Sequence, residues 1–385
     1  MHKGNHSHLF FFIIQIIFIL FCTASNDART FHAEGSDLFM GVGPKEMALG
    51  GAASAGTNTI YSVYWNPAGL AELKTNSWVI SRQFQSDLDS NLNAFNFLGI
   101  SFLSPWLNIG GLKSTIAFSF IPRIYAKSSG AFSEDDIESV FLRFLLPSFP
   151  SNFDGDLSSK TKDYRLTWAV TPKVDPTWSF GFTVSRIECG STFCGVEAED
   201  DEVTMYSANA AAVAVNMGGK YFCTDDVTFG FNIKDLDTTL DTELKKVSKD
   251  SLEEDISFHK ISFPRDVTIG VQWRYSQSLY YSLDIQSIYG DYGGYVMDIG
   301  LIRAGLEYRA QEFPLIYRFG MIVPRKIEIE GLGRDPFPGF AVPTLGLGWM
   351  SKYMDVDVVF YVHPLMSLSR KTLYPSLDLD FKYNF

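Results

Sequence analysis

Histidine, the residue most used for acid–base catalysis, is scarce in this chain. Beyond residue 24 the sequence has only His32, His259 and His363. It contains neither a G-x-S-x-G nucleophile elbow nor an H-E-x-x-H metal-binding pair. A lipase-like site in a β-protein would need serine and histidine on adjacent strand faces, whereas His363 precedes Pro364 and fits a loop better. The sequence therefore predicts a protein that is not an enzyme and carries no cofactor.

Carboxylates are concentrated at residues 197–202, which contain Glu197, Glu199, Asp200, Asp201 and Glu202. Several oxygen ligands of this kind can bind Ca²⁺, but the spacing of an EF-hand loop is absent. A solvated acidic loop that opposes self-association explains the same residues and is the favoured interpretation. No metal site is expected.

Arginines on the polar faces of predicted strands are candidates for binding a carboxylate head group, because a guanidinium pairs bidentately with a carboxylate. They are Arg165, Arg274, Arg303 and Arg318. Each can instead pair with an acid on a neighbouring strand, such as Glu307, Asp284 or Asp357. We single out Arg303 and Arg318 as candidate substrate-binding residues, with ion pairing as the open alternative.

Residues 1–24 have the features of an export signal. Lys3 provides the positive start, residues 9–21 form an apolar core interrupted only by Gln15, and residues 22–24 are small. The core is shorter than the roughly 18 residues of a spanning helix. Lipid attachment at Cys22 is an alternative that the bulky Phe21 disfavours.

The composition favours a membrane β-barrel. Aromatic residues make up 15% of the 385 residues, and such residues form the interfacial girdles of barrels. Mean hydropathy is only +0.02, too low for a bundle of membrane helices, so a chain in the membrane would have to span it as a closed barrel. The formal charge of −12 argues against a nucleic-acid partner, because phosphates require a basic face.

Fourteen segments of alternating residues follow residue 75, each about as long as a tilted membrane strand. In 266–275, for example, Val267 and Ile269 share one face, and Thr268 and Gly270 the other. A soluble secreted sandwich alternates too, so periodicity alone leaves that alternative open. We place the segments at 76–87, 94–103, 111–126, 161–171, 176–187, 203–217, 226–233, 263–275, 278–288, 298–309, 313–323, 341–351, 353–362 and 375–385.

The lengths of the links favour the barrel. Links after even-numbered segments are short, and those after odd-numbered segments are mostly longer. Short periplasmic turns and long external loops alternate in this way in outer-membrane barrels, and a sandwich has no reason to show it. We therefore expect an all-β, transmembrane antiparallel barrel of about fourteen strands over residues 76–385, integral to the outer membrane, with both termini periplasmic.

Two of the expected external loops have helical patterns. In 127–160, Phe141, Phe144 and Leu145 follow an N-cap-like start at Ser133 with helical spacing. In 234–262, a more charged stretch covers about 240–252. Helices there would shelter an apolar mouth and make Phe141, Phe144 and Leu145 candidate substrate-binding residues. The alternative is a helix that only caps its own loop.

Three cysteines follow the export signal, so at least one is unpaired within the chain. Cys189 and Cys194 are close enough in sequence to staple one external loop, and they form the candidate disulfide. Cys223 falls in an expected periplasmic turn, about 25–30 Å of bilayer away from both. The paired C-x-x-C pattern of zinc sites is absent.

The stretch from Gly41 to Leu73 is rich in Gly, Ala and Ser and contains Asn66-Pro67-Ala68. Small residues allow backbone to pack on backbone, so we predict that residues 25–75 are an extension and a plug inside the barrel. The alternative is a Gly-rich leader that ends in an ordinary Asn-Pro turn. The segment resembles the N-terminal hatch of FadL-type outer-membrane channels, which carries an Asn-Pro-Ala motif.

The resemblance to the FadL-type family extends over nearly the whole mature chain. It includes the strand pairs around Phe263–Val271 with Tyr281–Gln286 and around Ile302–Tyr308 with Tyr317–Gly320, and the C-terminal Phe385. The closest similarity is to a FadL-like group of spirochaetes. Pro122 interrupts the third predicted strand, and the resemblance makes it the candidate for the kink that opens such channels laterally. A proline near an external strand end is the alternative.

The resemblance implies passive uptake of hydrophobic small molecules, long-chain fatty acids foremost. It also implies outer-membrane lipid and the outer-membrane assembly machinery as partners, and we expect a monomer. The second hypothesis is a FadL-like barrel that serves as a docking platform for protein secretion or surface display.

Overall fold

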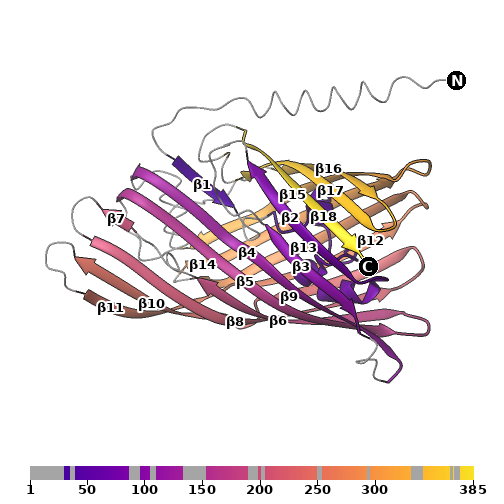
Figure 1. Cartoon of the computed structure of the whole chain (residues 1–385), viewed down its shortest axis with the longest axis horizontal. Helices are drawn as coiled ribbons and strands as arrows, with labels where there is room; N and C mark the ends of the chain where they lie inside the picture. The colour runs from indigo at the N-terminus through magenta and orange to yellow at the C-terminus, as the bar shows by residue number, and fades with distance from the viewer. Residues whose placement is uncertain are drawn as a thin grey trace.

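The computed structural model describes residues 30–34, 40–85, 96–104, 110–132, 153–189, 198–200, 204–248, 254–292, 295–330, 341–364, 367 and 373–385. Its strands form one antiparallel sheet that closes on itself (Figure 1). Fourteen strands make the closed ring, as the sequence predicts. They are β2 (Ser77–Gln85), β3 (Phe97–Leu103), β4 (Leu112–Phe132), β5 (Phe153–Pro172), β6 (Trp178–Cys189), β8 (Thr204–Phe222), β9 (Val227–Lys234), β12 (Arg265–Arg274), β13 (Leu279–Tyr292), β14 (Tyr295–Arg309), β15 (Leu315–Glu330), β16 (Val342–Met350), β17 (Met354–Val362) and β18 (Pro375–Asn384).

The ring is closed by β18, which pairs with β2 from Ser376↔Gln85 to Asn384↔Ser77. Every other strand of the ring pairs with the next one along the chain, with β8 joined to β9 and β9 to β12. A closed ring leaves no backbone edge within the membrane, and this is the requirement that lipid places on a spanning sheet.

The alternation of the strands places apolar side chains outside and polar ones inside. On β13, the outward Leu283 and Ile285 are 45% and 53% exposed, whereas the inward Asp284 and Gln286 are 1% and 4% exposed. This is the sense that a barrel in lipid requires and the reverse of a soluble sandwich. It excludes the soluble alternative, because the aromatic and aliphatic faces point away from the interior.

One end of the barrel, the turn end, has short connections such as 275–278, 310–314 and 351–353. Aromatic rings gather on the outer wall near this end, where Trp273 packs against Tyr275 and Tyr281 with ring centroids 5.3 and 5.9 Å away. Such rings belong at a lipid–water interface, because they are apolar in the body and polar at one edge. The opposite end is called the loop end below.

Two strands project from the barrel at the loop end (Figure 1). They are β10 (Thr239–Ser248) and β11 (Glu254–Ser262), which continue β9 and β12 beyond corners at 235–238 and 263–264. The helix expected over 240–252 is therefore wrong for the described residues to 248. The stretch has good helix formers, but its pairing with β8 and β11 over eight or more residues outweighs that propensity.

Two short strands complete the rim at the loop end. β7 (Ala198–Asp200) pairs with both β5 and β8, and β1 (Thr30–Glu34) pairs with β4 from Tyr125 to Ser129. β1 thus lies at the loop end, whereas Phe385 lies at the turn end with its N–H bonded to the Asn76 carbonyl. Residues before Thr30 lie outside the described residues, so the side of the N-terminus itself stays a prediction.

The outward sense of the strands is open to a stability test. Leu283 faces outward between Val271 and Ala304 of the neighbouring strands. We expect Leu283→Arg to destabilise the barrel in lipid vesicles, lowering its free energy of unfolding by about 2–4 kcal/mol if the position lies near the bilayer centre. Ser282→Ala, at the inward neighbour, should have a much smaller effect. Denaturant titration in vesicles measures both, and equal stability of Leu283→Arg and the unmodified protein would contradict the orientation.

Candidate functional site

Residues 40–73, called the inner segment below, lie inside the barrel against the inward faces of the wall strands. They contain the helices α2 (Pro44–Ala48) and α3 (Ser62–Trp65) and the 3₁₀ turn η1 (Pro67–Glu72), and most of their side chains are buried. Among the described residues, no helix is long and apolar enough to cross a membrane. The inner segment contacts the wall through η1, which lies against β4, β5, β6 and β8, and through α2, which lies against β15 to β18.

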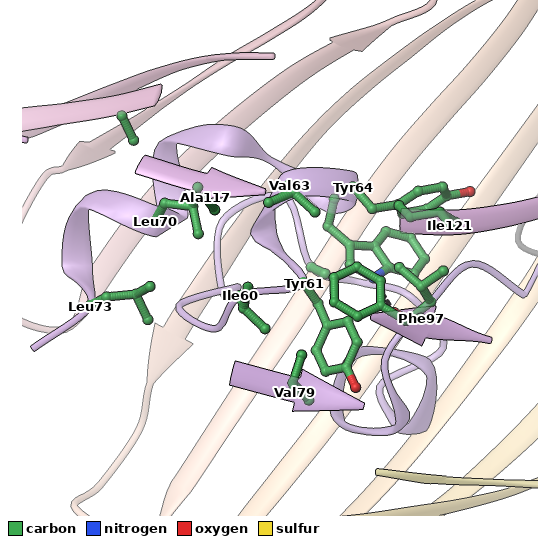
Figure 2. Close-up of a cluster of buried hydrophobic side chains, with 14 of the residues drawn as sticks. Ile60, Tyr61, Val63, Tyr64, Leu70, Leu73, Val79, Phe97, Ala117 and Ile121 are labelled. Carbon is green, nitrogen blue, oxygen red and sulfur yellow. Dashed lines mark hydrogen bonds between the residues drawn. The ribbon is translucent and has the colours of Figure 1, made fainter. Parts of the chain in front are cut away.

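An apolar cluster joins the inner segment to one side of the wall (Figure 2). Ile60 and Tyr61 lie against Val79 of β2 and Phe97 of β3, with the Tyr61 and Phe97 ring centroids 4.5 Å apart. Ala117 and Ile121 of β4 belong to the same cluster. All of these wall residues face inward, so the cluster is a local hydrophobic core inside an otherwise polar lumen.

Asn66, the first residue of the Asn-Pro-Ala motif, is fully buried and links two parts of the structure. Its Oδ1 accepts from the Ala68 N–H at 3.1 Å, and this caps the turn that starts at Pro67. Its Nδ2 donates to the carbonyls of Ser54 at 2.6 Å and Gly219 at 3.1 Å. The motif therefore both shapes the inner segment and ties it to β8.

Seven inward-facing glycines of the wall, called the glycine belt below, receive the inner segment. A Cβ at any of them would come under 3.0 Å from an inner-segment atom, closer than real Cβ contacts. Six of them form three cross-strand pairs, so the two glycines of each pair lie at the same level of the wall. The belt consists of Gly181, Gly218, Gly230, Gly270, Gly305, Gly320 and Gly346.

The sequence contains a signal for this belt that the sequence analysis missed. Each of the seven is an inward position between mostly apolar outward neighbours, as in Phe180-Gly181-Phe182 and Phe319-Gly320-Met321. Glycine weakens a strand, so its repetition at inward positions of seven strands indicates a close approach of backbone. What packs there cannot be read from the strands alone.

Asp284 of β13 anchors the inner segment by hydrogen bonds. Its carboxylate accepts from the N–H groups of Ala53 at 2.9 Å and Ser54 at 2.8 Å, and from the Ser54 hydroxyl at 2.8 Å. On the other side of the lumen, the Tyr61 hydroxyl donates to Asp380 of β18 at 2.7 Å. Buried carboxylates of the wall thus take their partners from the inner segment, which makes its position specific.

Glu46 of α2 is buried within the inner segment. Its Oε1 accepts from the hydroxyls of Thr57 and Thr59 at 3.1 and 2.6 Å. Burial raises the pKa of Glu46 above its ordinary value, because the charged form loses its hydration. The two threonine hydroxyls hold this carboxyl group in place.

Arg303 and Arg318, the candidate head-group residues, lie inside the barrel and have protein partners. Arg303 donates to Gln286 at 2.7 Å and to the Gly50 carbonyl at 3.0 Å, and it lies over the Trp65 ring. Arg318 donates to Glu307 at 2.7 Å and to Asp357 at 2.5 Å. Arg318 thus forms the ion pairs of the alternative, whereas the partners of Arg303 named here are an amide and a backbone carbonyl. Recognition of a ligand head group by either residue stays a prediction.

The other two arginines are also paired. Arg165 donates to Asp163 at 2.7 Å and to the Val63 carbonyl of the inner segment at 2.9 Å. Arg274 donates to Asp226 at 2.8 Å on the exposed turn end. Arg165 thus belongs to the wall of the inner-segment site, and Arg274 does not.

A strip of apolar side chains lines the lumen on the loop-end side of the inner segment. On β14 the inward residues change from Met297, Ile299 and Leu301 to Arg303, Gly305 and Glu307. Because Gly305 contacts the inner segment, the apolar residues lie beyond it toward the loop end. Ile322 of β15, the cross-strand partner of Arg303, pairs on its other side with Val342 of β16. We call these five apolar residues the apolar strip.

The sequence analysis missed the apolar strip because it sought the pocket in the loops. On one face of this stretch, positions 297, 299 and 301 are all apolar, whereas the other face includes the charged Asp298. Apolar residues at successive inward positions of a barrel strand indicate an apolar lumen, once the inward face is known. The expected candidates Phe141, Phe144 and Leu145 lie outside the described residues, whose strands β4 and β5 extend to Phe132 and from Phe153.

Pro122 lies at an irregularity of β4. The pairing of β4 with β5 shifts register between Pro122 and Ile124. On the other edge of β4, β3 pairs up to Phe120 and β1 begins at Tyr125, and no described residue pairs with the positions between. This agrees with the expected weakening of the wall, and a lateral opening at this point stays a prediction.

Cys189 and Cys223 lie at opposite ends of the barrel, as the strand order predicts. Cys189 is the last residue of β6 at the loop end, and Cys223 is free and exposed in a turn at the turn end. Cys194 lies outside the described residues, so the Cys189–Cys194 disulfide stays a prediction.

The architecture is that of a known group of channels. The chain is similar in structure to the P. putida toluene transporter TodX, with a TM-score of 0.57 and 12% identity. The similarity covers 90% of this chain and 99% of TodX. The chain has the FadL-type fold. The Ralstonia pickettii toluene transporter TbuX has a TM-score of 0.54 at 14% identity, with 90% and 98% of the two chains covered.

A third neighbour is a Pseudomonas aeruginosa FadL homologue, which has a TM-score of 0.53 at 10% identity and covers 92% of this chain and 99% of its own. No protein-family model and no curated protein sequence matches the chain. At these identities the FadL-type fold is shared, and the residues of the lumen have to be interpreted from their own contacts.

The glycine belt predicts how the inner segment can be displaced. A methyl group at Gly320 would meet the backbone of Leu49 and Gly50, whereas one at Gly300 of β14 would come no closer than 3.6 Å to Lys326. We expect Gly320→Ala to weaken docking of the inner segment by roughly 1–3 kcal/mol through overpacking. Amide exchange at Ala48–Ala53 should accelerate in this variant and not in Gly300→Ala. Unchanged exchange in both would show that the belt does not hold the segment.

Proposed function

We propose that this FadL-type barrel is an outer-membrane channel for the passive uptake of hydrophobic small molecules. The observation that carries the proposal is the apolar strip, because a lumen that only conducts water and ions has no use for Met297, Ile299 and Leu301 facing inward. Binding sites for small ligands are mostly apolar with a few polar groups that fix orientation. The strip, with Arg303 at its inner end, has this composition.

The proposed path begins at the loop end and passes along the strip to the inner segment. Capture by Phe141, Phe144 and Leu145 at the mouth remains part of the proposal. The molecule then leaves water for the strip, which contributes about 0.8 kcal/mol for each buried CH₂ group. It moves on when the inner segment, the proposed hatch, shifts. A lateral exit at Pro122 is the alternative, and it would require the neighbouring Arg123 to release its partner Asp235.

Long-chain fatty acids are the substrates that we propose first. A fatty acid would place its chain along the strip and its carboxylate toward Arg303 or Arg318, provided that one of them exchanges a protein partner for the ligand. Small aromatic hydrocarbons are the other class, because the structural neighbours TodX and TbuX are toluene transporters. We propose a monomer in outer-membrane lipid, assembled through its C-terminal strand and Phe385.

A docking platform for secretion or surface display is the second candidate. It is favoured by the projecting strands β10 and β11, which expose Phe258 to 77% and Ile256 to 47% beside exposed charges such as Asp241 and Lys260. Charged side chains of this exposure do not lie in lipid, so the two apolar residues face water. Exposed apolar groups on a projecting sheet are suited to contact another protein.

Affinity for fatty acids of increasing length separates the two candidates. We expect affinity of the purified protein to rise about three- to fourfold for each CH₂ group that reaches the strip, from 0.8 kcal/mol per group. Leu301→Asn should flatten this slope, and Leu306→Ala on the outer face of β14 should leave it unchanged. Affinity that is independent of chain length, or no binding at all, would favour the docking platform.

A further inference from the structure

An ion pair connects two parts of the wall that are separated by three strands. Arg123 of β4 donates from Nη1 and Nη2 to the two carboxylate oxygens of Asp235, at 2.9 and 2.8 Å. Asp235 follows the last residue of β9, and β5, β6 and β8 separate β9 from β4 in the wall. The two side chains are only 4% and 7% exposed. We call this pair the crossbar.

Three irregularities of the wall meet at the crossbar. Arg123 is the extra residue of the β4 bulge next to Pro122. Asp235 begins the β9–β10 corner with φ 55°, a left-handed conformation that non-glycine residues seldom adopt. The Arg123 guanidinium lies 4.6 Å from the ring centroid of Phe263, which is in the β11–β12 corner. Three breaks of regular strand are thus combined to build one contact.

Further groups hold the crossbar rigid. The Asp235 N–H donates to the Asn216 side chain at 2.8 Å, and Asp163 of β5 lies 4.0 Å from Arg123. A bidentate pair with a stacked ring fixes the guanidinium plane as well as its position. Strained backbone that the surroundings maintain is often found where a protein requires a particular geometry.

The crossbar lies directly on the loop-end side of the inner segment. Residues close to the crossbar contact the inner segment. Lys234, which precedes Asp235, lies 4.2 Å from the Tyr64 ring centroid. Arg165, two residues beyond Asp163, donates to the Val63 carbonyl. The β4–β9 side of the lumen is therefore occupied by a charged, fixed layer at this level. The apolar strip belongs to β14, β15 and β16, on a different part of the wall.

We propose that the crossbar sets the largest cross-section of molecule that reaches the inner segment, by blocking the β4–β9 side and confining the path to the apolar strip. This inference rests on the proposed function and names what selects its substrates. Linear chains and single rings fit a path along one part of the wall, whereas bulky polycyclic molecules require the crossbar to open. Opening it would leave buried charges without partners, so it stays closed.

The test uses the full chain with Arg123→Gln and Asp235→Asn together. The double change removes both charges at once and leaves neither partner buried with an unpaired charge. Asparagine also tolerates the left-handed backbone at position 235. The matched control is Arg265→Gln with Asp237→Asn. That pair lies at the same corner, with Asp237 at φ 48°, but it is exposed.

Uptake of hydrophobic solutes of graded cross-section into proteoliposomes is the measurement. We expect the double variant to admit a bulky polycyclic solute at least fivefold faster than the unmodified protein and a linear alkane less than twofold faster. The control should match the unmodified protein. Heat-modifiable migration on gels verifies that each barrel is folded, and Arg123→Lys, which keeps the charge, should retain the size limit.

An unchanged size profile, or an equal increase for all solutes, would overturn the inference, since equal increases indicate a loosened inner segment. If no hydrophobic solute crosses with any variant, the proposed function fails instead. Single-channel conductance with polyethylene glycols of graded size then decides the crossbar. A larger cut-off in the double variant supports it, and an equal cut-off refutes it.

Discussion

Contact between two backbones, the inner segment and the glycine belt, is the constraint on which the interior of this barrel depends. A fourteen-stranded ring encloses more space than its inward side chains fill. Here the space is filled by chain that approaches the wall at positions where any side chain would collide. The close approach brings the N–H groups of Ala53 and Ser54 to Asp284 and the Asn66 amide to β8, so steric fit and polar pairing specify the same position. Loss of either would leave buried polar groups without partners.

The lumen is divided by this arrangement into zones with different chemistry. At the level of the inner segment, buried ion pairs such as Arg318 with Glu307 and Asp357 stabilise the wall from within. Beyond it, toward the loop end, the β14–β16 side is apolar and the β4–β9 side carries the crossbar. A hydrophobic molecule gains free energy only on the apolar side, because the charged side offers paired groups that it cannot replace. Under the proposed function, these zones confine a hydrophobic molecule to the β14–β16 side of the lumen.

The strands were predictable from the sequence, and most of the interior was not. Alternation and link lengths place all fourteen strands, because a two-residue period repeats locally and each strand carries its own signal. Contacts such as Arg123 with Asp235 or Tyr61 with Asp380 join residues over 100 positions apart, and no local pattern announces which strands face each other across a lumen. The stretch at 239–248 shows that a local signal can also mislead, because its residues favour a helix but form a strand that pairs with β8. The glycine belt and the apolar strip had visible signals, which become readable once inward and outward faces are known.

Photolabelling of the lumen tests the central claim most directly. An alkyl chain with a terminal diazirine, bound to the protein in vesicles and activated by light, inserts into the side chains that it touches. The account predicts labels on Met297, Ile299, Leu301 and Ile322, which an excess of unlabelled fatty acid suppresses. Labels confined to outward residues such as Leu283 and Ile285, unaffected by the competitor, would show that the chain only dissolves in the surrounding lipid and would contradict uptake along the strip.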